Sequence, residues 1–107
     1  MLDETVTTHL LYDCYGALLT ERQRRILEMR LFDDWSLGEI AEALRISRQA
    51  VHDTVTKTVS QLEGYETKLG ILASHLRRRE KIEQLEVLLT SKYSVSDDVV
   101  QLIRALQ

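Results

Sequence analysis

The stretch SLGEIAEALRISRQAVHDTVTKTV, residues Ser36–Val59, decides the fold. Ser36 and Glu39 form a capping box, in which two residues exchange side-chain and backbone hydrogen bonds at the start of a helix. Apolar residues then follow at helical spacing as far as Leu44, and Ser47 caps a second helix after a two-residue turn. Two capped helices joined by so short a turn must cross sharply, so the stretch predicts a helix-turn-helix.

The side chains expected at the crossing fit this interpretation. Ala41 is small where the second helix must approach, and Leu44, Ile46 and Val51 fill the wedge between the helices. Such turns usually hold a glycine, where this chain has Arg45. A left-handed arginine costs on the order of 1 kcal/mol, so we expect a slightly different turn. A generic, well-capped three-helix bundle is the alternative.

The rest of the chain also has helical patterns. Thr20 and Gln23 form another capping box, and Ser96 is expected to cap a short last helix. Gly70 is either the end of a helix or a tolerated interruption. The expected helices cover residues 4–18, 21–33, 37–44, 48 to at least 62, and a short segment after 96. A coiled-coil-like stripe steps through Leu62, Tyr65, Leu69, Leu72 and Leu76.

Composition supports an all-α fold. Hydrophobic residues make up 44% of the 107 residues, charged residues 29%, and proline is absent. All-β folds, which need frequent turn residues, are therefore disfavoured. We predict an all-α helix-turn-helix bundle with a C-terminal helical extension. It would form one domain over residues 1–107, with the helix-turn-helix core at 20–60 and the extension at 61–107.

The net charge of −3 argues against tight, non-specific binding of nucleic acid. Its distribution matters more, because the whole acidic excess lies in residues 1–19 and residues 20–60 are balanced. A local basic face is therefore still expected. The single cysteine, Cys14, fits a reducing compartment, and we see neither a signal peptide nor an apolar run long enough for a membrane. These features predict a cytoplasmic protein without membrane insertion.

The polar face of the second helix is the candidate for reading bases. Arginine can donate two hydrogen bonds to guanine, glutamine pairs with adenine, and aspartate accepts from cytosine. The base-edge candidates are Ser47, Arg48, Gln49, His52, Asp53 and Thr56. The phosphate-contact candidates are Arg22, Arg24, Arg25 and Lys57. An ordinary solvated helix face is the alternative.

A basic run near the C-terminus has three interpretations. It is a solvated helix face paired with neighbouring glutamates, a phosphate contact to nucleic acid including RNA, or a protein-docking site. Its members are Arg77, Arg78, Arg79 and Lys81.

No pattern in the sequence indicates catalysis. The three histidines, His9, His52 and His75, are scattered, and Cys14 has no neighbouring metal ligand. Cys14 is best interpreted as a small core residue, and no glycine-rich phosphate loop occurs. We therefore expect neither an enzyme nor a metal or other cofactor.

Residues 20–53, TERQRRILEMRLFDDWSLGEIAEALRISRQAVHD, resemble the promoter-reading C-terminal domain of sigma factors, an all-helical relative of winged-helix folds. They resemble still more the YlxM family of small bacterial helix-turn-helix proteins, and the likeness continues through EGYETKL at Glu63–Leu69. His52 departs from the aromatic residue expected there. The resemblance implies an all-helical regulatory protein. The family is encoded beside the signal recognition particle GTPase, which implies a role in that pathway.

Two hypotheses follow. The first is a DNA-binding regulator that acts through its second motif helix, and the second is an adaptor for the signal recognition particle GTPase or its RNA. Basic residues gathered beside the motif would favour DNA, whereas a dominant 77–81 patch would favour RNA or protein.

The apolar stripe after Leu62 would leave a large face uncovered in a small monomer. We therefore also expect a homodimer formed through the C-terminal half.

Overall fold

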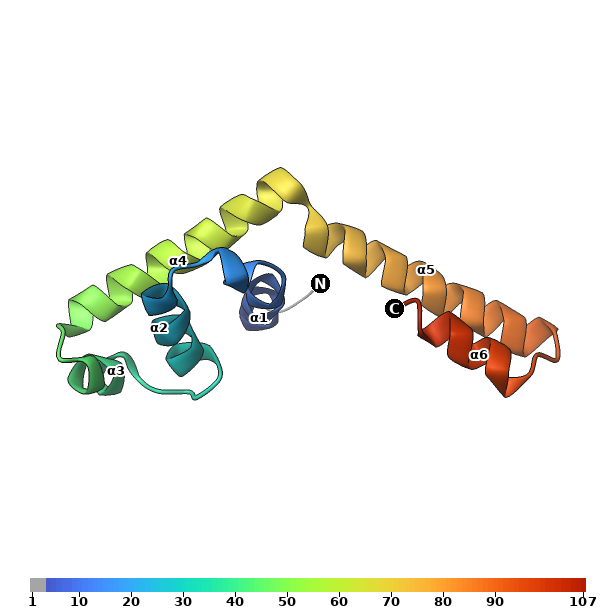
Figure 1. Cartoon of the computed structure of the whole chain (residues 1–107), viewed down its shortest axis with the longest axis horizontal. Helices are drawn as coiled ribbons and strands as arrows, with labels where there is room; N and C mark the ends of the chain where they lie inside the picture. Colours follow the sequence, from blue (N-terminus) through green and yellow to red (C-terminus); the bar gives the residue numbers. More distant parts are fainter. Residues whose placement is uncertain (1–3) are drawn as a thin grey trace. The chain divides into compact units, whose positions relative to one another are not determined.

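A computed structural model describes residues 4–107, and every regular element in this part of the chain is helical (Figure 1). The elements are α1 (Glu4–Tyr15), the 3-10 helix η1 (Gly16–Leu18), α2 (Glu21–Leu31), α3 (Leu37–Leu44), α4 (Arg48–Leu69), α5 (Ile71–Lys92) and α6 (Asp97–Arg104). The chain divides into two compact units, residues 1–70 and 71–107. The all-α prediction is confirmed.

Side-chain caps set where the helices of the first unit begin. Thr20 and Gln23 form the predicted capping box at α2, and Ser36 and Glu39 form the one at α3. At the start of α4, the hydroxyl of Ser47 accepts a hydrogen bond from the amide of Ala50 at 3.0 Å. Each cap satisfies an amide that has no partner within its helix, so these boundaries follow from local chemistry.

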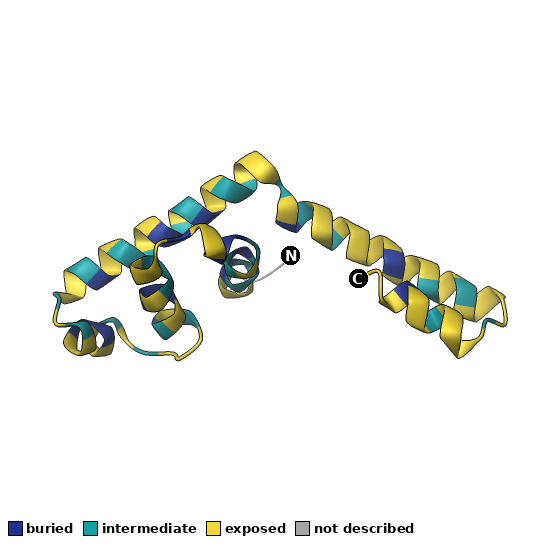
Figure 2. Cartoon of the chain, in the orientation of Figure 1, coloured by how far each residue is buried: buried dark blue, intermediate teal, exposed yellow. Residues whose placement is uncertain are grey.

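The predicted helix-turn-helix is formed by α3 and α4. Ile26 of α2 is fully buried with Ile40, Ala41 and Val51. Leu44, Ile46 and Val55 are among the partly buried side chains that pack against this cluster. Figure 2 shows the buried residues of α2, α3 and α4 turned toward one another. The wedge predicted from the sequence is therefore the core of the motif.

Arg45 makes the turn between α3 and α4 in a left-handed conformation, with φ 58° and ψ 44°. The amide of Ile46 donates to the carbonyl of Ala41 at 3.1 Å, so α3 ends in a Schellman motif. The turn therefore keeps the geometry that glycine usually provides, and the slightly different turn expected for an arginine is not seen.

The first helix extends this core along α4. Leu11 and Tyr15 of α1 are buried, as is Leu62 of α4. The hydroxyl of Tyr15 donates to the carboxylate of Glu66 at 2.5 Å, which ties the end of α1 to the second half of α4. Thr58 is fully buried, which the apolar pattern did not predict. The predicted first helix is also interrupted, because α1 ends at Tyr15 and the chain continues as η1.

The second unit is a hairpin in which α6 returns along α5 (Figure 1). Ile82 of α5 and Ile103 of α6 are buried. Arg104 closes the hairpin, because its Nη2 lies 2.7 Å from a Glu86 carboxylate oxygen that also accepts from its Nε at 2.9 Å. This pairing raises the pKa of Arg104.

Further features differ from the predictions, beginning with α2, which ends at Leu31 and not at residue 33. Gly70 ends α4 in a left-handed conformation, with φ 61°, so the apolar stripe predicted to continue from Leu62 is divided between two helices. The chain also divides after Gly70 rather than at residue 61. Ser96 stands at the start of α6 but makes no side-chain capping bond. At this helix, Asp97 and Asp98 in the first turn already stabilise the positive N-terminal end of α6 electrostatically.

Candidate nucleic-acid interface

The first turns of α4 present one continuous polar face. Gln49, Asp53 and Thr56 follow each other at spacings of four and three, and Arg48 and His52 form the neighbouring row. Every predicted base-edge residue is exposed, including Ser47 at the cap. The opposite side of the helix carries the buried Val51. Core packing of α4 therefore leaves all six candidates accessible to a partner.

Asp53 organises the polar face. The side-chain amide of Gln49 donates to its carboxylate at 2.8 Å, and His52 Nδ1 lies 3.6 Å from the same oxygen. The side chains of His52 and Asp53 are 57% and 67% exposed, so these contacts are those of a hydrated surface and not of a closed site. A carboxylate thus stands among the hydrogen-bond donors of this face.

A hollow of about 530–670 Å³ lies on each of three sides of α2. The one beside α4 is lined by Arg22 and Lys57, together with Thr20, Thr54 and Gln61. Two phosphate-contact candidates from different helices therefore share one concavity. The hollow lies next to the polar face, because Lys57 follows Asp53 at a spacing of four and so continues the row of Gln49 and Asp53 along α4.

Arg22 also lines a second hollow, which it shares with Arg25 and with Leu44 at the end of α3. The three cationic side chains Arg22, Arg25 and Lys57 are consequently linked through two neighbouring hollows around the start of α2. Three of the four predicted phosphate-contact residues therefore lie around these two hollows.

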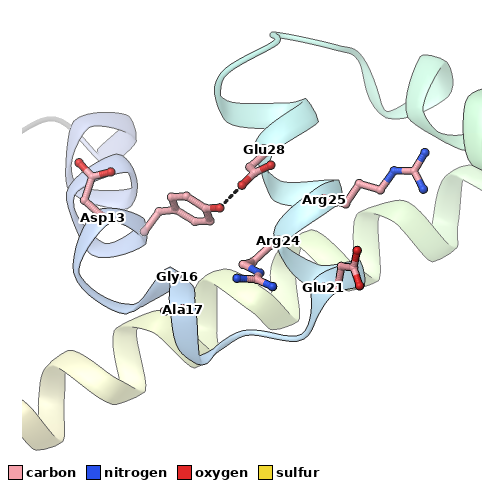
Figure 3. Close-up of a pocket in the computed structure, with 8 residues that line it drawn as sticks. Asp13, Gly16, Ala17, Glu21, Arg24, Arg25 and Glu28 are labelled. Atoms are coloured by element: carbon pink, nitrogen blue, oxygen red, sulfur yellow. Dashed lines mark hydrogen bonds between the residues drawn. The ribbon is translucent and has the colours of Figure 1, made fainter.

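Arg24 lines a third hollow, which it shares with Arg25 but not with Arg22 or Lys57. Figure 3 shows it in the hollow between α1 and α2, near Gly16 and Ala17. The hydroxyl of Tyr12 donates to the carboxylate of Glu28 in the same hollow. Burial and this hydrogen bond raise the pKa of Tyr12 to about 12. Arg24 thus faces a tyrosine–glutamate pair, whereas Arg22 lines the hollow beside Lys57.

The predicted C-terminal basic run is exposed on α5. Arg79 lies 3.5 Å from Glu83 in an ion pair between residues i and i+4. Within residues 4–107, no carboxylate lies within 4.0 Å of the charged groups of Arg77, Arg78 or Lys81. One of the predicted glutamate pairings is therefore seen, while Glu86 pairs with Arg104 instead.

Residues 4–107 contain no group of three or more His, Cys, Asp or Glu side chains positioned to hold a metal ion. Cys14 is half-buried and free of a disulfide, and burial raises the pKa of its thiol. No helix in this part of the chain is long and apolar enough to cross a membrane.

A family model described as "UPF0122: Putative helix-turn-helix protein, YlxM / p13 like" matches residues 2–104. The chain belongs to this UPF0122 family. A UPF0122 protein of Geobacillus kaustophilus is 44% identical over 99% of this chain and 96% of the relative. One from Halalkalibacterium halodurans is 42% identical over the same shares. One from Caldanaerobacter subterraneus is 49% identical over 80% of this chain and 74% of the relative.

Sequence reasoning missed some residues that line the candidate site of this UPF0122 protein. Thr54 and Gln61 line the hollow beside Arg22 and Lys57, and Gln61 accepts a hydrogen bond from Gln23 at 2.9 Å. The signal was present, because residues 54, 57 and 61 follow at helical spacing beside the polar face of α4. It was overlooked because uncharged polar residues on a helix usually mark only solvent exposure.

Proposed function

We propose that this UPF0122 protein is a regulator that binds duplex DNA, with α4 in the major groove. The observation that carries the proposal is the adjacency of two chemically different surfaces. A face of hydrogen-bonding side chains around Arg48 and Gln49 lies next to a hollow lined by Arg22 and Lys57. Base edges require the first kind of surface, and phosphates require the second.

The proposed roles follow from these positions. Ser47, Arg48, Gln49, His52, Asp53 and Thr56 would face base edges, and Arg22, Arg25 and Lys57 would contact phosphates. Arg24 would contribute least, since it faces the hollow beside α1. A protein that binds the bacterial chromosome works in the cytoplasm, and two copies would place two α4 helices on neighbouring half-sites. We therefore include a cytoplasmic location and a homodimer in the proposal.

Salt-titrated binding to a random-sequence duplex, followed by selection of preferred sequences from that pool, tests the proposal. We expect affinity that falls steeply with salt, because phosphate contacts release counterions. We also expect selection to converge on a motif. Absence of affinity for duplex DNA at low ionic strength would falsify the proposal.

A second candidate function is an adaptor for the signal recognition particle, which binds the particle's RNA or its GTPase. It is favoured by Arg77, Arg78 and Lys81, which are exposed and lack an ion-pair partner among the described residues. The same salt titration with particle RNA, and a pull-down with the GTPase, distinguishes the two functions. Binding that is lost on charge reversal at 77–81 but unaffected at Arg22 and Lys57 would favour the adaptor.

A further inference from the structure

The α5–α6 hairpin exposes more large apolar side chains than it buries. Its buried hydrophobic residues are Leu72, Ile82 and Ile103. Its exposed ones are Ile71 (48%), Leu85 (45%), Val87 (64%), Leu88 (48%), Tyr93 (63%), Val99 (39%), Leu102 (70%) and Leu106 (62%). Soluble proteins rarely leave apolar groups so concentrated in water, so this hairpin requires a covering partner.

Sequence spacing places several of these residues on stripes. Leu85 and Leu88 lie three residues apart on α5. On α6, Val99 and Leu102 lie three residues apart, and Leu106 follows in the turn just after the helix, so this end of the chain carries an exposed apolar ridge. Compact units shorter than about 40 residues usually need oligomerisation or another support for stability. Residues 71–107 fall in that range.

The charges of the hairpin favour a second copy of the same chain as the partner. The first half of α5 carries Arg77 and Arg78, whereas the opposite end of the hairpin carries Asp97 and Asp98 at the start of α6. Lys92 reduces the charge of that second end to a net −1. When two such hairpins pair antiparallel, the basic end of each lies against the acidic end of the other.

We infer that the α5–α6 hairpin is a dimerisation module, in which two copies bury their leucine ridges about a two-fold axis with Arg77 and Arg78 facing the partner's acidic end. An isologous contact uses the same surface on both copies, which suits a self-complementary hairpin. The inference rests on the proposed homodimer but not on DNA binding. The proposed dimer contact uses the same two arginines, Arg77 and Arg78, that the RNA-adaptor function would use to bind RNA.

Sedimentation equilibrium of the full chain across a concentration series tests the leucine ridge. Leu102→Asp should raise the dimer dissociation constant by at least about tenfold, because a charge would be buried at the contact. Leu102 is 70% exposed, so the change should leave the helical content and melting of the monomer intact. Leu18→Asp is the matched control, since Leu18 is 56% exposed but lies in the first unit, and it should dimerise like the wild type.

Charge reversal tests the antiparallel pairing. The pair R77E/R78E and the pair D97K/D98K should each weaken dimerisation, and the chain carrying all four changes should recover it. A wild type that is monomeric at every concentration overturns the homodimer itself. A dimer unaffected by Leu102→Asp overturns the hairpin surface, and failure of the four-residue chain to recover overturns the antiparallel arrangement. Each outcome leaves DNA binding to be judged by its own titration.

Discussion

The side-chain amide of Gln49 donates a 2.8 Å hydrogen bond to the carboxylate of Asp53, one turn further along α4. His52 lies 3.6 Å from the same carboxylate. Two proposed base-reading side chains are thus held by a third, which carries a negative charge. The proposed DNA-facing surface therefore includes a group that repels phosphates while it orients its neighbours.

Removal of this charge should strengthen binding to DNA. Asp53→Asn retains the size and a side-chain oxygen that accepts from Gln49, but it takes a carboxylate away from the DNA-facing surface. We expect affinity for a duplex pool to rise about three- to tenfold, since about 1 kcal/mol is the scale of one such interaction. Fluorescence anisotropy measures it. A loss of both affinity and sequence preference would instead indicate that Asp53 accepts from a base.

Base and phosphate contacts should respond differently to truncation. Arg48→Ala and Gln49→Ala should reduce the preference for the selected sequence over the pool. Arg22→Ala and Lys57→Ala should weaken binding to all sequences, and each should reduce the salt slope by about 1, because one phosphate is no longer neutralised. Arg24→Ala is the matched control within α2, because that side chain lies in the hollow beside Tyr12. Equal reductions in affinity for Arg22→Ala and Arg24→Ala would contradict this division.

The turn between α3 and α4 offers a test of backbone strain. Arg45 is left-handed at φ 58°, a conformation that residues other than glycine, asparagine and aspartate seldom adopt. Arg45→Gly should raise the free energy of unfolding by about 1 kcal/mol, because glycine adopts this conformation readily. Urea denaturation measures the change, and Arg45→Ala, which removes the side chain but keeps the strain, should not show the gain.

The helix starts were predictable because caps depend on residues three apart. The start of each of three helices was predicted from its N-cap residue, which is Thr20, Ser36 or Ser47. The role of Gly70 was ambiguous in the sequence, since a glycine can either end a helix or lie within one. Only its backbone conformation shows that it ends α4. The exposed polar face of α4 was equally predictable from periodicity.

Interactions between distant segments were not predictable. The Tyr12–Glu28 pair joins residues sixteen apart, and the Arg22–Lys57 hollow depends on how α2 crosses α4. Arg22, Arg24 and Arg25 look alike in sequence, and only their positions around α2 separate Arg22 from Arg24, while Arg25 lines a hollow with each of them. Local patterns therefore identified the candidate residues, while tertiary packing decided which of them lie together.

Stability should depend on pH through Tyr12. Burial, together with the hydrogen bond to Glu28, raises its pKa from 10.0 to about 12. The unfolded chain therefore loses this proton first, and the contribution to stability is complete below about pH 10 and is lost as pH rises toward 12. Urea titrations from pH 8 to 12 should show a steeper fall in the free energy of unfolding for the wild type than for Tyr12→Phe. Parallel curves would show that this tyrosine titrates normally.

The buried hydroxyl of Thr58 gives a last test of the core. Thr58 is fully buried on α4, and its Oγ1 has no hydrogen-bond partner among the described residues. A buried hydroxyl without a partner costs about 1–3 kcal/mol, so Thr58→Val, which replaces it with a methyl group of similar size, should raise the free energy of unfolding by about 1 kcal/mol or more.

Val51 supplies the matched reverse change. It is also fully buried on α4, but in the apolar cluster of the helix-turn-helix. Val51→Thr introduces a hydroxyl into that cluster and should lower stability by about 1–3 kcal/mol, while Val51→Asp should prevent folding because it would bury a charge. Urea denaturation of Thr58→Val and Val51→Thr compares the loss and the gain of a buried hydroxyl at two positions on α4. If Thr58→Val lowers the free energy of unfolding, the Thr58 hydroxyl has a hydrogen-bond partner in solution. If Val51→Asp keeps the wild-type melting temperature, the packing of α3 against α4 is contradicted.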